Sequence, residues 1–253
     1  MIMEYISGLK NPKAIFWRSL KERKGRRESG CFLVEGDKMV LEAFASDFSV
    51  EAVLIREDRK NEDFPIPSGI PVWLLSVSVF DSISDTKTPQ GIAAVLKASV
   101  SEVTGSHLLA LDDVQDPGNV GTIIRTADAA GFDGLLLSAG CADIFSPKVL
   151  RATMGSIYRM PFRTVPDLAA SLRDLRENGY SVLSSQLDGE PFYERMDVSE
   201  QFCLIIGNEG NGISEEVRAE ATHRLKLPMR GGAESLNAAI AAAIMMYDLA
   251  RDF

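Results

Sequence analysis

Three segments of the sequence combine glycine with side chains that could take part in chemistry. The first, QDPGNVGTIIRTADAAG at residues 115–131, follows an apolar run and contains Asn119 and Arg125. Glycine lets the backbone turn sharply or approach a ligand, and a guanidinium binds phosphate or stabilises developing negative charge. The segment contains neither GxGxxG nor GxxxxGK[ST], so the patterns of dinucleotide-binding and P-loop proteins are absent. A nucleotide-binding module of the doubly wound type is therefore disfavoured.

Arg125 lies within a predicted helix, where two interpretations compete. The helix has an apolar stripe with helical spacing, formed by Val120, Ile123, Ile124 and Ala127, and Arg125 projects roughly opposite that stripe. Periodicity alone therefore favours a solvated surface arginine. Because helical side chains lean toward the N-terminus, a long arginine could also reach back toward the edge of a sheet.

The second and third segments follow two later strands. FCLIIGNEGNGISEEV, residues 202–217, has three glycines within six residues, with Glu209 among them, and Ser214 is predicted to cap the next helix. LPMRGGAESLNAAIAAAIMMYDL, residues 227–249, is predicted to begin a helix near Glu234 and Ser235. Capping explains one of Ser235 and Asn237 in its first turn, but it does not easily explain both.

These segments need elements that bring them together, and the second half of the chain predicts such elements. Strand-like runs alternate with helix-like segments, which is the rhythm of a parallel sheet with helices on both faces. In such sheets ligands bind at the carboxyl ends of the strands. The predicted strands span 108–114, 134–138, 161–165, 180–186, 202–207 and 223–229.

The first half predicts a separate α/β domain. A helix is expected from Asn11-Pro12 to about Gly25, and another over 37–46. A small, polar stretch at 97–106 is typical of a linker. We therefore expect one domain over 1–98 and a second over 105–253. The strands predicted in the first half span 31–36, 50–57, 72–76 and 91–98.

Charge is unevenly distributed along the chain. The net charge is −9, yet residues 10–27 carry eight Lys or Arg and one acid. Such a segment is either a solvated helix face or a local patch that attracts RNA phosphates. For the second case we predict an RNA-binding set near its end: Lys21, Arg23, Lys24, Arg26 and Arg27.

Composition narrows the remaining classes. The opening residues MIMEYISGLK do not resemble a signal peptide, and the longest apolar run, at 238–246, is too short to span a membrane. The three cysteines are far apart, which favours free thiols in the cytoplasm. Two histidines, neither near a cysteine, make a His/Cys metal site unexpected, so we predict none.

Together, the three segments resemble the three ordered motifs of the SpoU (TrmH-like) branch of the SPOUT RNA methyltransferases. The resemblance rests on GNVGTIIRTADAAG, IIGNEGNGISEEV and LPMRGGAESLNAAIAAAI, and it spans about 150 residues with SPKVLRATMGSIYRMPF between the first two. More loosely, FLVEGDKMVLEA and its surroundings are similar to the family's RNA-binding domain, which has a ribosomal-protein-like fold. Asn208 departs mildly from the family pattern, which more often has a small residue there.

The resemblance implies an activity, a cofactor and an architecture. The family transfers a methyl group from S-adenosylmethionine to a ribose 2′-hydroxyl of RNA, and its members are homodimers. The resemblance also implies a trefoil knot at the C-terminal end of the parallel sheet. The basic first helix favours 23S ribosomal RNA, with transfer RNA as the alternative substrate and a non-catalytic RNA-binding or ribosome-assembly protein as the alternative class.

The resemblance also assigns residues. It places the catalytic centre at Arg125, with Asn119, Glu209, Ser235 and Asn237 as its other polar positions. Since an arginine side chain in a protein stays protonated, we expect Arg125 to bind phosphate and stabilise alkoxide charge, while the proton leaves to water, phosphate or Glu209. The implied contacts to the cofactor fall on Gly207, Leu227, Met229, Leu236 and Ser185.

Overall fold

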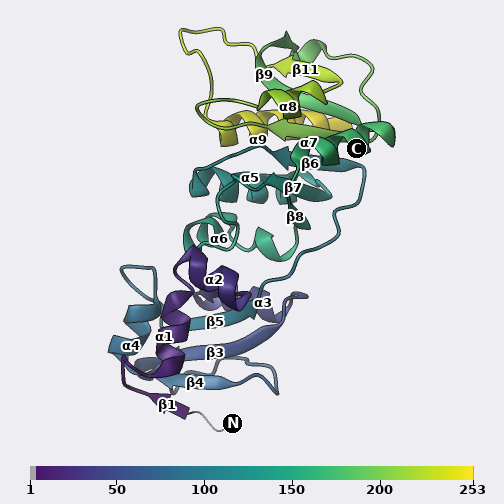
Figure 1. The fold of residues 1–253 in the computed structure, drawn as a ribbon. Helices are drawn as coiled ribbons and strands as arrows, with labels where there is room; N and C mark the ends of the chain where they lie inside the picture. Colours follow the sequence, from purple (N-terminus) through teal and green to yellow (C-terminus); the bar gives the residue numbers. More distant parts are fainter. Residues whose placement is uncertain (1–3, 253) are drawn as a thin grey trace. The chain divides into compact units, whose positions relative to one another are not determined.

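The computed structural model describes residues 4–252, which form two compact units (Figure 1). The first contains residues up to Ser99 together with 143–158, and the second contains 100–142 and the chain from Arg159 onward. Residues 143–158 therefore pack within the first unit, whereas the sequence prediction assigns them to the second domain. In the described part of the chain, no helix is both long enough and apolar enough to span a bilayer.

The first unit is built on a mixed five-stranded sheet in the order β1-β4-β3-β5-β2. Strands β1, β4 and β3 run parallel, while β5 pairs antiparallel with β3 and β2. The strands are β1 (Glu4–Ile6), β2 (Cys31–Glu35), β3 (Val50–Arg56), β4 (Val72–Leu75) and β5 (Ile92–Lys97). The helices are α1 (Pro12–Ser19), α2 (Arg23–Ser29), α3 (Asp37–Phe44), α4 (Val77–Ile83) and α6 (Pro147–Thr153), with short 3-10 turns η1 (Glu57–Arg59) and η2 (Ser156–Tyr158).

The single helix predicted over the basic segment is wrong, because the chain bends between α1 and α2. Arg26 holds this bend by donating from Nη1 to the carbonyls of Leu20 and Lys21, each at 2.7 Å. Gly25 permits the close approach, since a Cβ there would lie 2.1 Å from the carbonyl oxygen of Ser19. Local periodicity could not predict a break that depends on a side chain capping the preceding helix.

Arg26 is therefore a structural residue, rather than the RNA contact that its place in the basic segment predicts. Its side chain is only 7% exposed, and its Nη2 lies 2.6 Å from Oδ2 of Asp143. Lys21 is half-buried and donates to the carbonyl of Ser84 at 2.9 Å. Within the predicted RNA-binding set, the exposed cations are Arg23, Lys24 and Arg27.

Aromatic contacts hold residues 143–158 within the first unit. The ring of Phe145 stacks on Phe32 with centroids 4.4 Å apart, and the hydroxyl of Tyr158 donates to the carbonyl of Met39 at 3.0 Å. Phe32 is completely buried. The segment thus contributes to the core of the first unit, although sequence position places it between two strands of the second.

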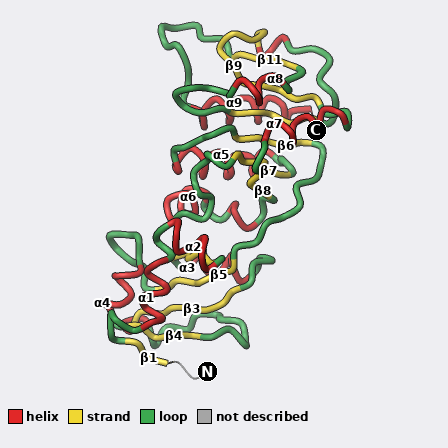
Figure 2. The backbone as a smooth tube through the Cα atoms, viewed as in Figure 1, coloured by secondary structure: helices red, strands yellow, loops and turns green. Residues whose placement is uncertain are grey.

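The second unit contains a six-stranded, fully parallel sheet in the order β11-β9-β10-β6-β7-β8 (Figure 2). Helices α7 and α8 pack with one face, and α9 packs on β10 and beside α5 on the other. This confirms the predicted α/β class with helices on both faces, whereas the knot stays a prediction. The elements are β6 (His107–Leu111), α5 (Pro117–Ala130), β7 (Gly134–Ser138), β8 (Phe162–Val165), α7 (Leu168–Glu177), β9 (Ser181–Pro191), η3 (Phe192–Glu194), β10 (Phe202–Ile206), α8 (Glu215–Ala219), β11 (His223–Lys226), α9 (Ala238–Leu249) and η4 (Ala250–Asp252).

Candidate active site

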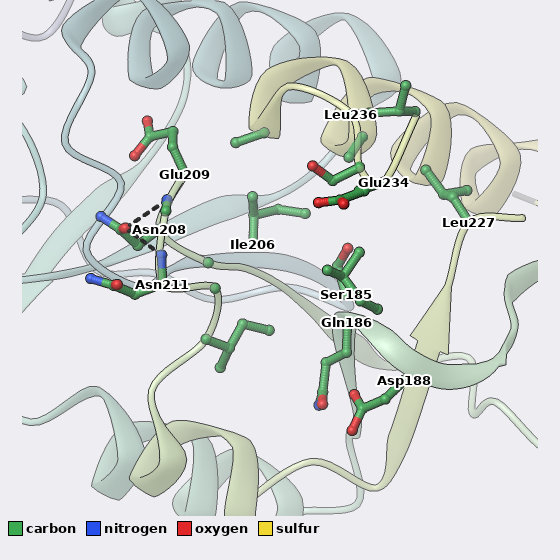
Figure 3. Close-up of a pocket in the computed structure, with 18 of the residues that line it drawn as sticks. Ser185, Gln186, Asp188, Ile206, Asn208, Glu209, Asn211, Leu227, Glu234 and Leu236 are labelled. Atoms are coloured by element: carbon green, nitrogen blue, oxygen red, sulfur yellow. Dashed lines mark hydrogen bonds between the residues drawn. The ribbon is translucent and has the colours of Figure 1, made fainter. Parts of the chain in front are cut away.

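The carboxyl ends of β9, β10 and β11 surround a pocket of about 490 Å³. Figure 3 shows Leu227, Glu234 and Leu236 on one side of this pocket, with Ser185 and Gln186 along β9. The volume lies in the range of small-molecule sites, and the position is where parallel sheets bind ligands. All five residues to which the resemblance assigns cofactor contacts line it: Ser185, Gly207, Leu227, Met229 and Leu236.

The loop after β10 is a tight turn tied together by Asn208. Its Oδ1 accepts from the backbone N–H groups of Gly210 and Asn211, both at 2.9 Å, and its Nδ2 donates to the carbonyl of Asp113 at 2.7 Å. Gly207 allows the loop to fold back on itself, because a Cβ there would lie 2.4 Å from the carbonyl carbon of Gly212. The departure from the family pattern at Asn208 therefore supplies a brace between the first and second loops.

A chain of side-chain hydrogen bonds joins all three loops beside the pocket. Asn119 donates from Nδ2 to Glu209 at 2.8 Å, and its Oδ1 accepts from Nδ2 of Asn237 at 2.9 Å. Asn237 in turn caps α9, because its Oδ1 accepts from the N–H groups of Ala239 and Ile240. The structure thus brings together three of the five residues assigned to the catalytic centre.

The N-cap at Asn237 corrects the predicted start of the last helix. Helix α9 begins at Ala238, rather than near Glu234 and Ser235. Ser235 lies before the cap and lines the pocket with an exposed side chain. Capping therefore accounts for Asn237 alone, and Ser235 lies outside the helix.

Glu209 is an ionised hydrogen-bond acceptor. Besides Asn119, it accepts from the backbone N–H groups of Gln115 and Asp116, each at 3.2 Å. Burial has the largest single effect on the pKa of Glu209 and raises it, but these hydrogen bonds together outweigh burial, so the pKa lies below its ordinary range. A carboxylate held in this way is a poor proton acceptor, and its evident action is to fix the start of α5.

Replacing Glu209 tests that action through the pH dependence of stability. The Glu209→Gln variant is expected to melt at a lower temperature than the wild type at pH 7, because the new NH₂ group faces N–H donors. Because the pKa of Glu209 is lowered in the folded state, its carboxylate stabilises the fold fully at any pH above the ordinary pKa of a glutamate. This stabilisation is lost as the pH falls through the lowered pKa. Thermal unfolding should therefore show a constant difference at neutral pH that shrinks below about pH 4.

A matched control for this experiment is Glu216→Gln, which changes an exposed carboxylate on α8. It should melt close to the wild type throughout the pH series. An undiminished difference between wild type and Glu209→Gln at pH 3 would contradict the role of the ionised carboxylate.

Arg125 lies apart from this chain of hydrogen bonds. Its side chain is exposed on α5, opposite the buried stripe of Val120, Ile123, Ile124 and Ala127, as periodicity predicts. It does not line the pocket, and within residues 4–252 it has no hydrogen bond or ion pair. A single chain therefore leaves this guanidinium free to meet a ligand or another molecule.

Strand β9 contains pocket residues that the sequence did not single out. The register with β11 passes from Arg224 opposite Ser184 to Leu225 opposite Glu190, so residues 185–189 bulge out of the ladder and line the pocket up to Asp188. Gly189 makes the return possible, because a Cβ there would lie 2.4 Å from the carbonyl oxygen of Arg224. The predicted strand ends at residue 186, whereas β9 continues to Pro191, and the only local signal for the bulge was a glycine three residues past the predicted end.

The pocket fits the cofactor that the resemblance implies. Leu227, Met229 and Leu236 provide apolar contact, which suits an adenosine ring. The buried Oε1 of Gln186 accepts no hydrogen bond from the described residues, while Nε2 of the same amide donates to the hydroxyl of Ser184 at 2.6 Å. S-adenosylmethionine carries N–H groups that could satisfy such an acceptor. Within residues 4–252, no His, Cys, Asp or Glu cluster is suited to a metal ion.

Comparison with family models gives two matches. Residues 106–247 match the SpoU rRNA Methylase family, and residues 11–94 match an MRM3-like substrate binding domain. The two matches follow the order of the sequence prediction, with the substrate-binding domain first.

Individual relatives extend over the whole chain. The chain is 38% identical to a 23S rRNA (guanosine(2553)-2′-O)-methyltransferase, RlmP, of Bacillus subtilis, across 98% of this chain and 99% of the relative. The AdoMet-bound rRNA methyltransferase of Sinorhizobium meliloti is 31% identical, with a TM-score of 0.89 over 99% of this chain and 98% of that one. The SpoU methyltransferase AviRb of Streptomyces viridochromogenes, in complex with AdoMet, is 25% identical, with a TM-score of 0.86 over 96% and 98%.

Proposed function

Because the chain belongs to the SpoU rRNA methylase family, we propose that it transfers a methyl group from S-adenosylmethionine to a ribose 2′-hydroxyl of 23S ribosomal RNA. The observation that carries this proposal is the pocket at the strand ends, with the linked side chains of Glu209, Asn119 and Asn237 beside it. The full-length relative in Bacillus subtilis supports 23S ribosomal RNA as the substrate.

The residues of the chain act by positioning and by charge. The pocket holds the cofactor, which supplies the methyl group when bound. Asn119 and Asn237, fixed by Glu209 and by the start of α9, orient the substrate side of the site. Arg125 binds a phosphate beside the target ribose and stabilises the charge that develops on its 2′ oxygen. Since Glu209 is a poor proton acceptor, the 2′-hydroxyl proton leaves to water or to a phosphate.

The two predicted domains divide the work. Residues 1–98 bind RNA, and residues 105–253 carry out methyl transfer. In the first domain the exposed cations Arg23, Lys24 and Arg27 on α2 contact phosphates. The match of residues 11–94 to a substrate binding domain supports this division. The activity belongs in the cytoplasm, where ribosomal RNA is.

A homodimer is part of the proposal. The last helix exposes an apolar stripe of Ile240, Ile244 and Tyr247, with Tyr247 54% exposed, and Leu236 is exposed just before the helix begins. A second copy would cover this stripe, and the free Arg125 of a neighbouring helix would then meet the partner. Light scattering coupled to size exclusion is expected to give twice the mass of one chain; the mass of a single chain would contradict the dimer.

Mapping of ribose methylation tests the function itself. Total RNA from a deletion strain is expected to lack one 2′-O-methyl group in 23S ribosomal RNA, and the purified protein with S-adenosylmethionine should restore it. Loss of a methyl group from transfer RNA instead would move the substrate to that class. Calorimetric titration with S-adenosylmethionine separates the enzyme from a non-catalytic RNA-binding protein, which would show no binding.

A further inference from the structure

The cations of the second unit fall into two groups. Outside residues 218–230, most arginines are engaged by carboxylates: Arg173 and Arg176 pair with Glu220, and Arg195 pairs with Asp248. The isolated Arg125 and Arg163 are the exceptions. In contrast, Arg224, Lys226 and Arg230 have no hydrogen bond or ion pair from their side chains to any residue in the described range 4–252. In a chain of net charge −9, this run of free cations requires an explanation.

These three cations are exposed on β11 and on the segment that follows it toward the pocket. Arg224 and Lys226 flank the fully buried Leu225 on β11, so their side chains lie together on the outer face of that strand. Arg230 is exposed directly after Leu227 and Met229, two residues that line the cofactor pocket. The acids on the neighbouring strand β9, Asp188 and Glu190, form no ion pair with them within residues 4–252.

We propose that Arg224, Lys226 and Arg230 form a second RNA-binding surface, which contacts phosphates beside the target nucleotide. The inference rests on the proposed function only in naming RNA as the ligand. It extends that function, because the basic segment of the first unit would otherwise be the only RNA contact outside the catalytic centre. Unpaired guanidinium and ammonium groups release counterions when they meet phosphates, so they contribute affinity that depends on salt.

Edge protection is the competing explanation, because β11 is at the edge of the sheet and charged side chains discourage strand addition. The opposite edge provides a matched control. Strand β8 is also an edge strand and carries the exposed Arg163, whose side chain has no partner in residues 4–252. If the cations of β11 only protect an edge, replacing them should affect RNA affinity no more than Arg163→Gln.

The test measures the affinity of the full chain for a 23S ribosomal RNA transcript over a salt series. Each of Arg224→Gln, Lys226→Gln and Arg230→Gln is expected to reduce the slope of log affinity against log salt by about 0.7 to 0.9. The triple variant should bind about tenfold more weakly at low salt. An Arg23→Gln, Lys24→Gln, Arg27→Gln variant of α2 serves as the reference for phosphate contact, and Arg163→Gln as the control.

Affinity for S-adenosylmethionine, measured by calorimetry, should be unchanged in the triple variant, because none of the three side chains lines the pocket. Slopes equal to that of Arg163→Gln would overturn the inference. Aggregation of the variants would then favour edge protection as the role of these cations. Methyl transfer by the wild type is measured separately. Its absence would overturn the proposed function, while the salt slopes would still decide whether the surface on β11 binds RNA.

Discussion

Gly207→Ala is expected to abolish measurable binding of S-adenosylmethionine, with a loss of at least about a hundredfold in affinity. The added Cβ would lie 2.4 Å from the carbonyl carbon of Gly212 and 2.5 Å from the backbone nitrogen of Ile213. Backbone atoms cannot move aside as a flexible side chain can, so the loop that Asn208 holds together must open. Calorimetric titration with S-adenosylmethionine, at a temperature where the variant is folded, measures the effect.

The control for Gly207→Ala is the same substitution in the third loop. At Gly231 a Cβ would meet no atom within 4 Å, so Gly231→Ala is expected to keep its affinity for the cofactor. Circular dichroism should show that both variants fold. Wild-type affinity in a folded Gly207→Ala variant would show that the turn between Gly207 and Gly212 does not shape the site.

Arg125→Ala is expected to lower the rate of methyl transfer by about 10² to 10³, the range for removal of a group that stabilises transition-state charge. Cofactor affinity should not change, because Arg125 does not line the pocket. Arg125→Lys, which keeps the positive charge, is expected to stay within about tenfold of wild type, with the same pH profile. Single-turnover methyl transfer over a pH series measures both variants.

Arg163→Ala is the control for Arg125→Ala, since it removes another exposed, unpaired arginine of the second unit. Its rate should match the wild type. A loss in Arg125→Lys as deep as that in Arg125→Ala would count against charge as the whole of its role, and would point to the planar, bidentate geometry of the guanidinium.

The structure also changes how the basic segment is understood. Arg26 and Arg27 are adjacent and chemically identical, yet Arg26 is enclosed and paired with Asp143 while Arg27 is exposed. No local pattern distinguishes them, because the difference depends on a carboxylate more than a hundred residues away that reaches α2 only when residues 143–158 pack within the first unit. A charge run predicts a cationic surface, but not which of its members are free.

In the three glycine-containing motifs, too, some features follow from local sequence and others depend on the fold. Local sequence determined the strands, the glycine turns and the order of three motifs, because hydrophobic periodicity and glycine conformation act over a few residues. From these came the parallel sheet and the expectation of a site at its carboxyl edge. The family resemblance, rather than periodicity, assigned the five cofactor residues, all of which line the pocket.

Tertiary structure alone decided what the polar residues do. Glu209 takes its lowered pKa from donors that lie about ninety residues earlier in the chain, and Asn237 caps α9 while donating to Asn119. The sequence could name these residues but could not join them, because a hydrogen bond requires a separation near 3 Å that only the packed sheet sets. For Arg125, periodicity predicted exposure correctly, and the fold showed that its side chain has no hydrogen bond or ion pair within residues 4–252.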